Sequence, residues 1–184
     1  MGPRIEPVPS DEILPAKTDV VIVGGGIIGT TAALYLAQQG VDVVLCEKGE
    51  VAGEQSSRNW GWCRKMVRDP REVPLVIEAL RLWGEMNETV EAETGFRTCG
   101  IMYLGADQAA LERLGGWLDI AREYQLDRRI IDGAEVASHL PQSEKKWAGA
   151  LYTPSDGKAE PQLAATAIAR AVRRKGVKLF AHCA

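Results

Sequence analysis

A glycine-rich run between an apolar strand and a helix constrains this fold more than any other sequence feature. Residues 19–23 are almost wholly apolar and β-branched, which is typical of a parallel strand buried on both faces. The glycine run at 24–29 follows at once, and residues 30–39 then carry apolar side chains at helical spacing. Residues 41–46 form a second strand-like run that ends at Glu47. This order predicts a βαβ unit within an α/β, Rossmann-like fold.

The spacing of the glycines gives each one a physical role. Gly24 permits a tight turn out of the strand, Gly26 lets backbone approach a pyrophosphate, and Gly29 lets the helix pack closely on the sheet. The helix N-terminus offers N–H groups and a positive dipole end to phosphates. Glu47 ends the second strand, where a carboxylate can accept both ribose hydroxyls. The candidate cofactor-binding residues of this unit are Gly24, Gly26, Ile27, Ile28, Gly29, Glu47 and Lys48.

These residues predict a dinucleotide but do not by themselves separate FAD from NAD. Glu47 argues against NADP, because a 2′-phosphate would meet a carboxylate there.

Downstream patterns predict further alternating elements. Helices are expected at 74–93, 106–125 and from Pro161 to about Lys175, and strands at 98–104, 129–131, 147–153 and 177–180.

Composition excludes several classes of protein. The formal net charge of −3 gives no electrostatic reason to expect a nucleic-acid partner. Residues 1–17 contain four prolines and no apolar run, so we expect a flexible tail rather than a signal peptide, and no integral membrane segment. The four cysteines are scattered without a C-x-x-C pair, which favours reduced thiols in a cytoplasmic protein. With two histidines and no ligand cluster, no metal site is expected.

Three stretches carry a family resemblance. The stretch from Asp19 to Glu47 resembles the N-terminal motif of FAD-dependent oxidoreductases. Residues 53–64 resemble the loop by which the D-amino-acid oxidase superfamily approaches its flavin, and residues 152–161 resemble that family's turn from the substrate domain back to the FAD domain. The superfamily includes glycine and sarcosine oxidases, D-amino-acid dehydrogenases and opine oxidases.

The resemblance implies FAD as the cofactor and adds site residues. It places Ser56, Ser57, Arg58, Asn59 and Gly61 along the pyrophosphate and isoalloxazine. Hydroxyls and amides there can donate to flavin atoms and tune the electron affinity of the ring.

Arg64 is the candidate catalytic residue, since it falls where sarcosine-oxidase-like members carry a basic residue beside the flavin. Trp60 and Trp62 flank Gly61, and we expect them to serve in packing, as tryptophans more often do.

The resemblance also implies a domain organisation. Residues 18–64 and 151–184 would form an incomplete FAD-binding domain, and residues 65–150 part of an α+β substrate-binding domain. The chain would be an N-terminal fragment whose C-terminal half, or a partner subunit, completes the enzyme.

The expected activity is oxidation of the C–N bond of a small-molecule amine or amino acid, by hydride transfer to the flavin and hydrolysis of the imine. Two alternatives remain open: an NAD-dependent Rossmann dehydrogenase, and a non-catalytic nucleotide-binding subunit of a heteromer.

Overall fold

The computed structural model describes residues 4–183, which form two compact units. Unit 1 comprises residues 4–62, Glu85–Phe96 and 159–183, and unit 2 comprises Cys63–Gly84 and Arg97–Lys158. The chain passes from unit 2 back to unit 1 between Lys158 and Ala159, within the turn region to which the resemblance pointed.

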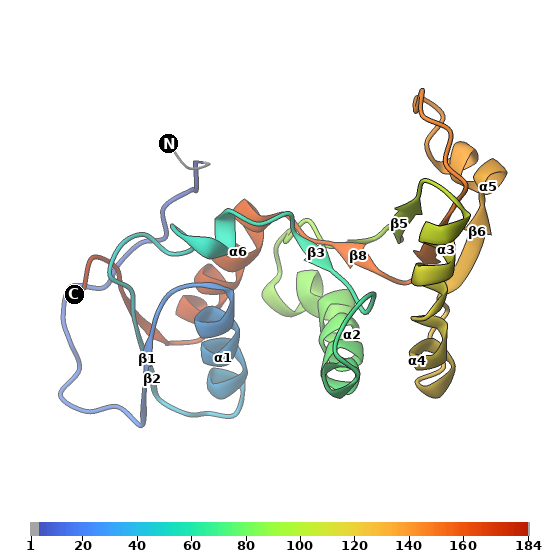
Figure 1. The fold of residues 1–184 in the computed structure, drawn as a ribbon. Helices are drawn as coiled ribbons and strands as arrows, with labels where there is room; N and C mark the ends of the chain where they lie inside the picture. Colours follow the sequence, from blue (N-terminus) through green and yellow to red (C-terminus); the bar gives the residue numbers. More distant parts are fainter. Residues whose placement is uncertain (1–3, 184) are drawn as a thin grey trace. The chain divides into compact units, whose positions relative to one another are not determined.

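Unit 1 contains the predicted βαβ unit. Its parallel sheet has the order β1-β2-β9, with Val20 opposite Val43 and Val44 opposite Lys178. Helices α1 and α6 pack against each other beside this sheet (Figure 1). The elements are β1 (Val20–Val23), α1 (Ile27–Gln38), β2 (Val43–Cys46), the 3-10 turn η1 (Gln55–Ser57), α6 (Pro161–Arg174) and β9 (Lys178–Phe180). The expected α/β architecture of this region is confirmed.

Unit 2 is built on an antiparallel sheet of order β5-β7-β6, with a short second sheet of order β3-β8-β4. Its strands are β4 (Arg97–Thr98), β5 (Ile101–Gly105), β6 (Arg129–Asp132), β7 (Gly149–Thr153), β8 (Gly157–Lys158) and the second residue of β3 (Trp62–Cys63), whose first residue ends the N-terminal segment of unit 1. Its helices are α3 (Gln108–Gly115), α4 (Leu118–Glu123) and α5 (Gly133–His139), with the 3-10 turn η2 (Pro70–Glu72). Met66, Ile101 and Leu151 form one core cluster, and Ile131, Val136 and Ala150 another.

Two expected elements differ in extent. The helix predicted at 106–125 is two helices, α3 and α4, since Gly115 and Gly116 lower helix propensity at the break. The strand predicted at 98–104 is likewise two short strands that meet different partners: β4 pairs with β8, and β5 pairs with β7.

Helix α2 (Val73–Val90) explains why the unit boundaries depart from the expected ranges, because its C-terminal part belongs to unit 1. There Asn87 Oδ1 accepts from the backbone N–H of Thr94 at 2.9 Å, and Thr94 O accepts from Glu160 N at 3.0 Å. Residues 85–96 are thereby tied to the start of α6.

Asp156 organises the polar interior of unit 2. Its fully buried carboxylate accepts from Lys65 N at 2.8 Å and Met66 N at 3.2 Å. Burial raises the pKa of Asp156, and these two N–H donors, Lys65 and the buried Arg128 oppose that rise. Arg128 Nη2 in turn donates to Lys65 O at 2.8 Å. The turn at 154–157 is thus fixed to residues about ninety positions earlier in the chain.

Part of the expected tail lies against unit 1. Val8 is buried, and Asp11 N donates to Leu179 O at 2.7 Å while the Asp11 carboxylate accepts from Leu179 N at 2.9 Å. Ion pairs from Asp11 to Arg173 at 3.4 Å and Lys178 at 3.5 Å add to this contact. The segment from Val8 to Asp11 therefore covers the β9 edge of the sheet, which would otherwise expose unpaired backbone groups.

Asp11 should make unit 1 stability depend on pH. Burial alone would raise its pKa, but the N–H of Leu179 and the charges of Arg173 and Lys178 bring the pKa below its ordinary value. The stabilisation is therefore present above the unfolded-state pKa and is lost as the pH falls through the folded-state pKa.

We predict that Asp11→Asn lowers the free energy of unfolding by about 1.5 kcal/mol at neutral pH, as expected for a hydrogen bond to a charged group. Urea unfolding at several pH values measures this, and the difference from wild type should shrink in acid. The neighbouring, exposed Glu12 supplies the control Glu12→Gln, which should unfold like the wild type. If both substitutions lowered the free energy of unfolding equally, the Asp11 carboxylate would not have the stabilising role given to it here.

Candidate cofactor-binding site

The turn after β1 requires glycine at two positions. Gly24 has φ +110°, in the region that L side chains rarely adopt, and its N–H donates to Cys46 O at 2.7 Å. A Cβ on Gly29 would lie 1.9 Å from Gly24 O. The first turn of α1 consequently sits directly on the backbone of the turn, as the glycine spacing predicts.

Gly26 makes room for a side chain of the following loop. A Cβ there would lie 2.9 Å from Ser56 Oγ, and that hydroxyl accepts from Ile27 N at 2.9 Å. Ser56 therefore stands at the N-terminus of α1, with a hydroxyl hydrogen of its own to donate. The helix itself provides no side-chain cap and has no acidic residue in its first turn, which suits an anionic ligand.

The Glu47 carboxylate joins two backbone turns. Oε2 accepts from Gly25 N at 2.7 Å and Oε1 accepts from Gly49 N at 2.8 Å, while the residue is only 9% exposed. A Cβ on Gly25 would lie 3.0 Å from Glu47 Cβ, so the glycine allows this approach. An ionised carboxylate has about four lone-pair sites, and two bonds leave capacity for ribose hydroxyls.

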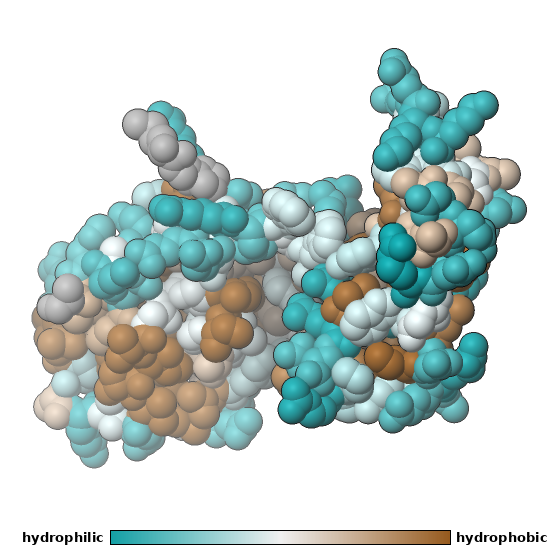
Figure 2. All heavy atoms as spheres, viewed as in Figure 1, coloured by the Kyte–Doolittle hydropathy of each residue, from teal (hydrophilic) through white to brown (hydrophobic). Residues whose placement is uncertain are grey.

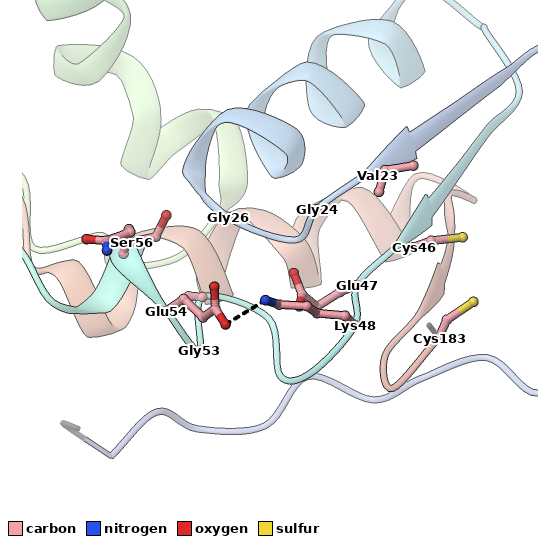
Figure 3. A pocket seen from close by; sticks show the side chains of 12 residues that line it. Val23, Gly24, Gly26, Cys46, Glu47, Lys48, Gly53, Glu54, Ser56 and Cys183 are labelled. Carbon is pink, nitrogen blue, oxygen red and sulfur yellow. Dashed lines mark ion pairs between the residues drawn. The ribbon is translucent and has the colours of Figure 1, made fainter. Parts of the chain in front are cut away.

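These groups surround a pocket of about 550 Å³ within unit 1, a volume typical of ligand sites (Figure 3). Lys48 Nζ and Glu54 Oε1 form an exposed ion pair at 2.9 Å beside it, drawn as the dashed line in Figure 3. The pairing raises the pKa of Lys48 and lowers that of Glu54. The pocket is lined by Val23, Gly24, Gly26, Cys46, Glu47, Lys48, Ala52, Gly53, Glu54, Gln55, Ser56 and Cys183.

The remaining loop candidates hold the loop in shape. Ser57 is buried, and its carbonyl accepts from Gln162 Nε2 at 3.1 Å. Asn59 Oδ1 accepts from Gly61 N at 2.7 Å, and Arg58 Nη2 donates to Gly53 O at 3.1 Å.

Gly61 has φ +71°, and a Cβ on it would lie 2.0 Å from Ala159 O. As at Gly29, backbone here passes against backbone without room for a side chain.

Ile27 and Ile28, the two predicted site residues at the start of α1, differ in their contacts. The Ile27 backbone meets Ser56 as described, whereas the Ile28 side chain is 81% exposed. Arg64 belongs to unit 2, where its guanidinium donates to Met66 O and to Val67 O and lies 5.9 Å from the Tyr103 ring centroid.

The two tryptophans are not packed in a core, contrary to expectation. Trp60 is 80% exposed and Trp62 43%, with their ring centroids 5.3 Å apart in a tilted arrangement.

Several lining residues were not among the predicted ones. Gly53, Glu54 and Gln55 lie in the loop that the resemblance identified, just before the residues we selected from it, and Ala52 immediately precedes that loop. Cys46 and Cys183 could have been found from topology, since the carboxyl ends of parallel β2 and β9 meet at one sheet edge.

The described residues were also compared with the requirements of a membrane-spanning helix and of a metal site. In the described range 4–183, no helix is long and apolar enough to cross a membrane. Nor do residues 4–183 bring together three His, Cys, Asp or Glu side chains that could hold a metal ion.

The glycine turn, the N-terminus of a helix whose own N-cap residue is a glycine, and the buried carboxylate define a dinucleotide-binding domain. The family model described as "FAD dependent oxidoreductase" matches residues 19–184, and the chain belongs to this family. The cofactor of the family is FAD, and the pocket fits its ADP part: donors at the start of α1 face where phosphates would lie, and Glu47 where a ribose would lie.

Solved structures agree with this assignment. The L-amino acid deaminase from Proteus myxofaciens, solved with anthranilate, is 37% identical with a TM-score of 0.93, covering 98% of this chain and 42% of that one. Glycine oxidase from Bacillus cereus ATCC 14579 is 26% identical with a TM-score of 0.81, covering 90% of this chain and 46% of that one.

Sequence relatives include mouse mitochondrial sarcosine dehydrogenase, which is 25% identical over 100% of this chain and 20% of its own length. N-methyl-L-tryptophan oxidase from Yersinia pestis (strain Pestoides F) is also 25% identical, over 90% of this chain and 45% of its own length. The chain thus spans less than half the length of the relatives it matches.

Gly29→Ala should destabilise the turn that forms the site. Because the new methyl would meet Gly24 O, we predict a loss of about 3 kcal/mol in unfolding free energy, at the upper end for overpacking. Urea unfolding measures this. The matched control is Gly84→Ala in α2, where a Cβ meets nothing within 4 Å and helix propensity improves. Equal stability of the two variants would show that the turn is not tight.

Proposed function

We propose that this chain provides the FAD-binding part of an oxidoreductase that oxidises the C–N bond of an amine or amino acid. The observation that carries the proposal is the likeness to the L-amino acid deaminase over nearly the whole chain, together with a pocket built for a dinucleotide. The names of other relatives, sarcosine dehydrogenase and glycine oxidase, point to the same substrate class.

The proposed reaction removes a hydride equivalent from the carbon that bears the amine, and the resulting imine hydrolyses in water. FAD, when bound, supplies the two-electron acceptor for this oxidation. The contribution of the residues seen here is binding: the start of α1 and Ser56 hold phosphate, and Glu47 holds the ribose.

Residues beyond this pocket would complete the site. Arg64 remains a predicted catalytic residue, on the resemblance alone. Ser57, Arg58, Asn59 and Gly61 would shape the loop toward the isoalloxazine, consistent with the bonds of Arg58, Asn59 and Gly61 within that loop and of Ser57 with Gln162. A cytoplasmic location remains a prediction from the sequence.

Turnover would also require protein that this chain does not provide, from a continuing polypeptide or a partner subunit. Val21, Val23 and Ile28 on β1 and α1 are more than half exposed, and Figure 2 shows hydrophobic side chains gathered over this part of unit 1. β1 is also an edge of its parallel sheet, with pairing to β2 on one side only among the described strands. Such an edge and such side chains suit burial against further structure.

A second candidate function has one observation behind it. The mouse mitochondrial pyruvate dehydrogenase phosphatase regulatory subunit is 28% identical over 91% of this chain. A regulatory role would use the same nucleotide pocket without turnover.

Substituting Glu47 tests the binding role directly. We predict that Glu47→Gln weakens FAD binding about tenfold or more, since a charge-assisted hydrogen bond contributes about 1.5–3 kcal/mol. Fluorescence titration with FAD measures this, with Glu50→Gln as the control, because Glu50 pairs with His182 outside the lining. Unchanged affinity in a folded Glu47→Gln protein would remove Glu47 from the site.

Screening amines against the FAD-loaded protein separates the two functions. Once the missing portion is supplied, we expect N-methylated or primary amino acids to bleach the flavin absorbance anaerobically. Tight FAD binding without bleaching by any amine, once the missing portion is supplied, would favour the regulatory alternative.

A further inference from the structure

Two thiols stand together on one wall of the pocket. Cys46 is the last residue of β2, and Cys183 follows β9. Both line the pocket, and the Cys183 side chain lies near enough to the Cys46 thiol to affect its pKa. Figure 3 shows the two sulfur atoms projecting to the same side, beside Glu47. Two cysteines on one wall of one pocket differ from the scattered arrangement that the sequence indicated.

Backbone bonds, rather than the thiols themselves, hold this arrangement. Cys46 stands opposite Phe180 in the parallel pairing of β2 with β9, and Glu47 N donates to Phe180 O at 2.8 Å. The chain then turns back, and Cys183 N donates to Glu47 O at 2.9 Å. A second bond, from His182 N to Gly49 O at 3.2 Å, fixes the same turn. The sheet edge therefore presents the two residues to each other whatever their redox state.

The two thiols differ in access. Cys183 is exposed, whereas Cys46 is half-buried. Burial and the neighbouring Cys183 raise the pKa of Cys46. A dissolved oxidant consequently meets Cys183 first, and Cys46 is placed to react second.

We propose that Cys46 and Cys183 form an oxidation site that closes to an intramolecular disulfide across the carboxyl ends of β2 and β9. With hydrogen peroxide as oxidant, the Cys183 sulfur attacks one peroxide oxygen, giving a sulfenic acid and one water. The Cys46 sulfur then attacks the sulfenic sulfur, and the displaced hydroxide takes the Cys46 proton as a second water. Two thiols thus lose two electrons and two protons, and the peroxide is reduced to two waters.

The disulfide would fasten the turn after β9 to β2. It would link residues far apart in sequence and so restrict the unfolded chain, which stabilises the folded state. The inference does not depend on the proposed cofactor, because both thiols and all the bonds that place them belong to unit 1.

Peptide mapping after oxidation tests the proposal. The purified protein is treated with stoichiometric hydrogen peroxide, free thiols are blocked with iodoacetamide, and digested peptides are analysed by mass spectrometry. We expect a peptide pair joined through Cys46 and Cys183 and a melting temperature several degrees above that of the reduced protein. Dithiothreitol should reverse both.

Single substitutions provide the matched controls. Cys183→Ser and Cys46→Ser should each abolish the cross-link, and Cys183→Ser changes an exposed side chain and leaves the fold intact. Cys63→Ser and Cys99→Ser should retain it. Oxidation of Cys183 to sulfinic acid without a cross-link would overturn the proposal. So would cross-linking through Cys63 or Cys99, or disulfides between molecules only.

Discussion

The carboxylate of Glu47 is the interaction on which the arrangement of unit 1 depends. One side chain at the end of β2 accepts from Gly25 in the turn after β1 and from Gly49 in the loop after β2. The two turns that enclose the pocket are thus fixed to each other by a nearly buried charge. Removing one partner of such a group leaves buried donors unsatisfied, which is more destabilising than the bond itself is stabilising.

Close contacts between backbone segments also fix the position of the pocket loop and of α1. Gly29 lies against the Gly24 carbonyl, and Gly61 lies against the Ala159 carbonyl. The first contact seats α1 on the turn, and the second holds the pocket loop at the start of α6. Between them Ser56 reaches the N–H of Ile27, so that the loop also meets α1. Helix, turn and loop therefore present one surface to a ligand, held by local contacts within unit 1.

The sequence predicted this part of the fold well because its signals are local. The run from Val20 to Glu47 combines a buried strand, spaced glycines and a helical period, each with a direct physical reading. The split of the helix at Gly115 escaped prediction, since the apolar spacing continues across it. The same holds for the position of Val8 and Asp11 on β9, which depends on a partner strand at the other end of the chain.

The sequence predicted the site residues that belong to one local motif. It did not predict those that come together from segments far apart in the chain. Glu47 follows from its place after β2, but the neighbourhood of Cys46 and Cys183 requires knowing that β9 pairs with β2. The approach of Gly61 to Ala159, a contact across nearly a hundred residues, likewise could not be read from the sequence pattern. Long-range pairing is what the sequence pattern leaves unspecified.

The most direct test of the account is the identity of the nucleotide that the purified protein carries. Denaturing the protein, removing the polypeptide and recording the absorbance and mass of the released ligand requires no assumption about substrate. We predict that FAD is released, and that Glu47→Gln protein prepared in the same way releases less of it. Release of NAD instead, or a protein that binds NAD in preference to added FAD, would contradict it.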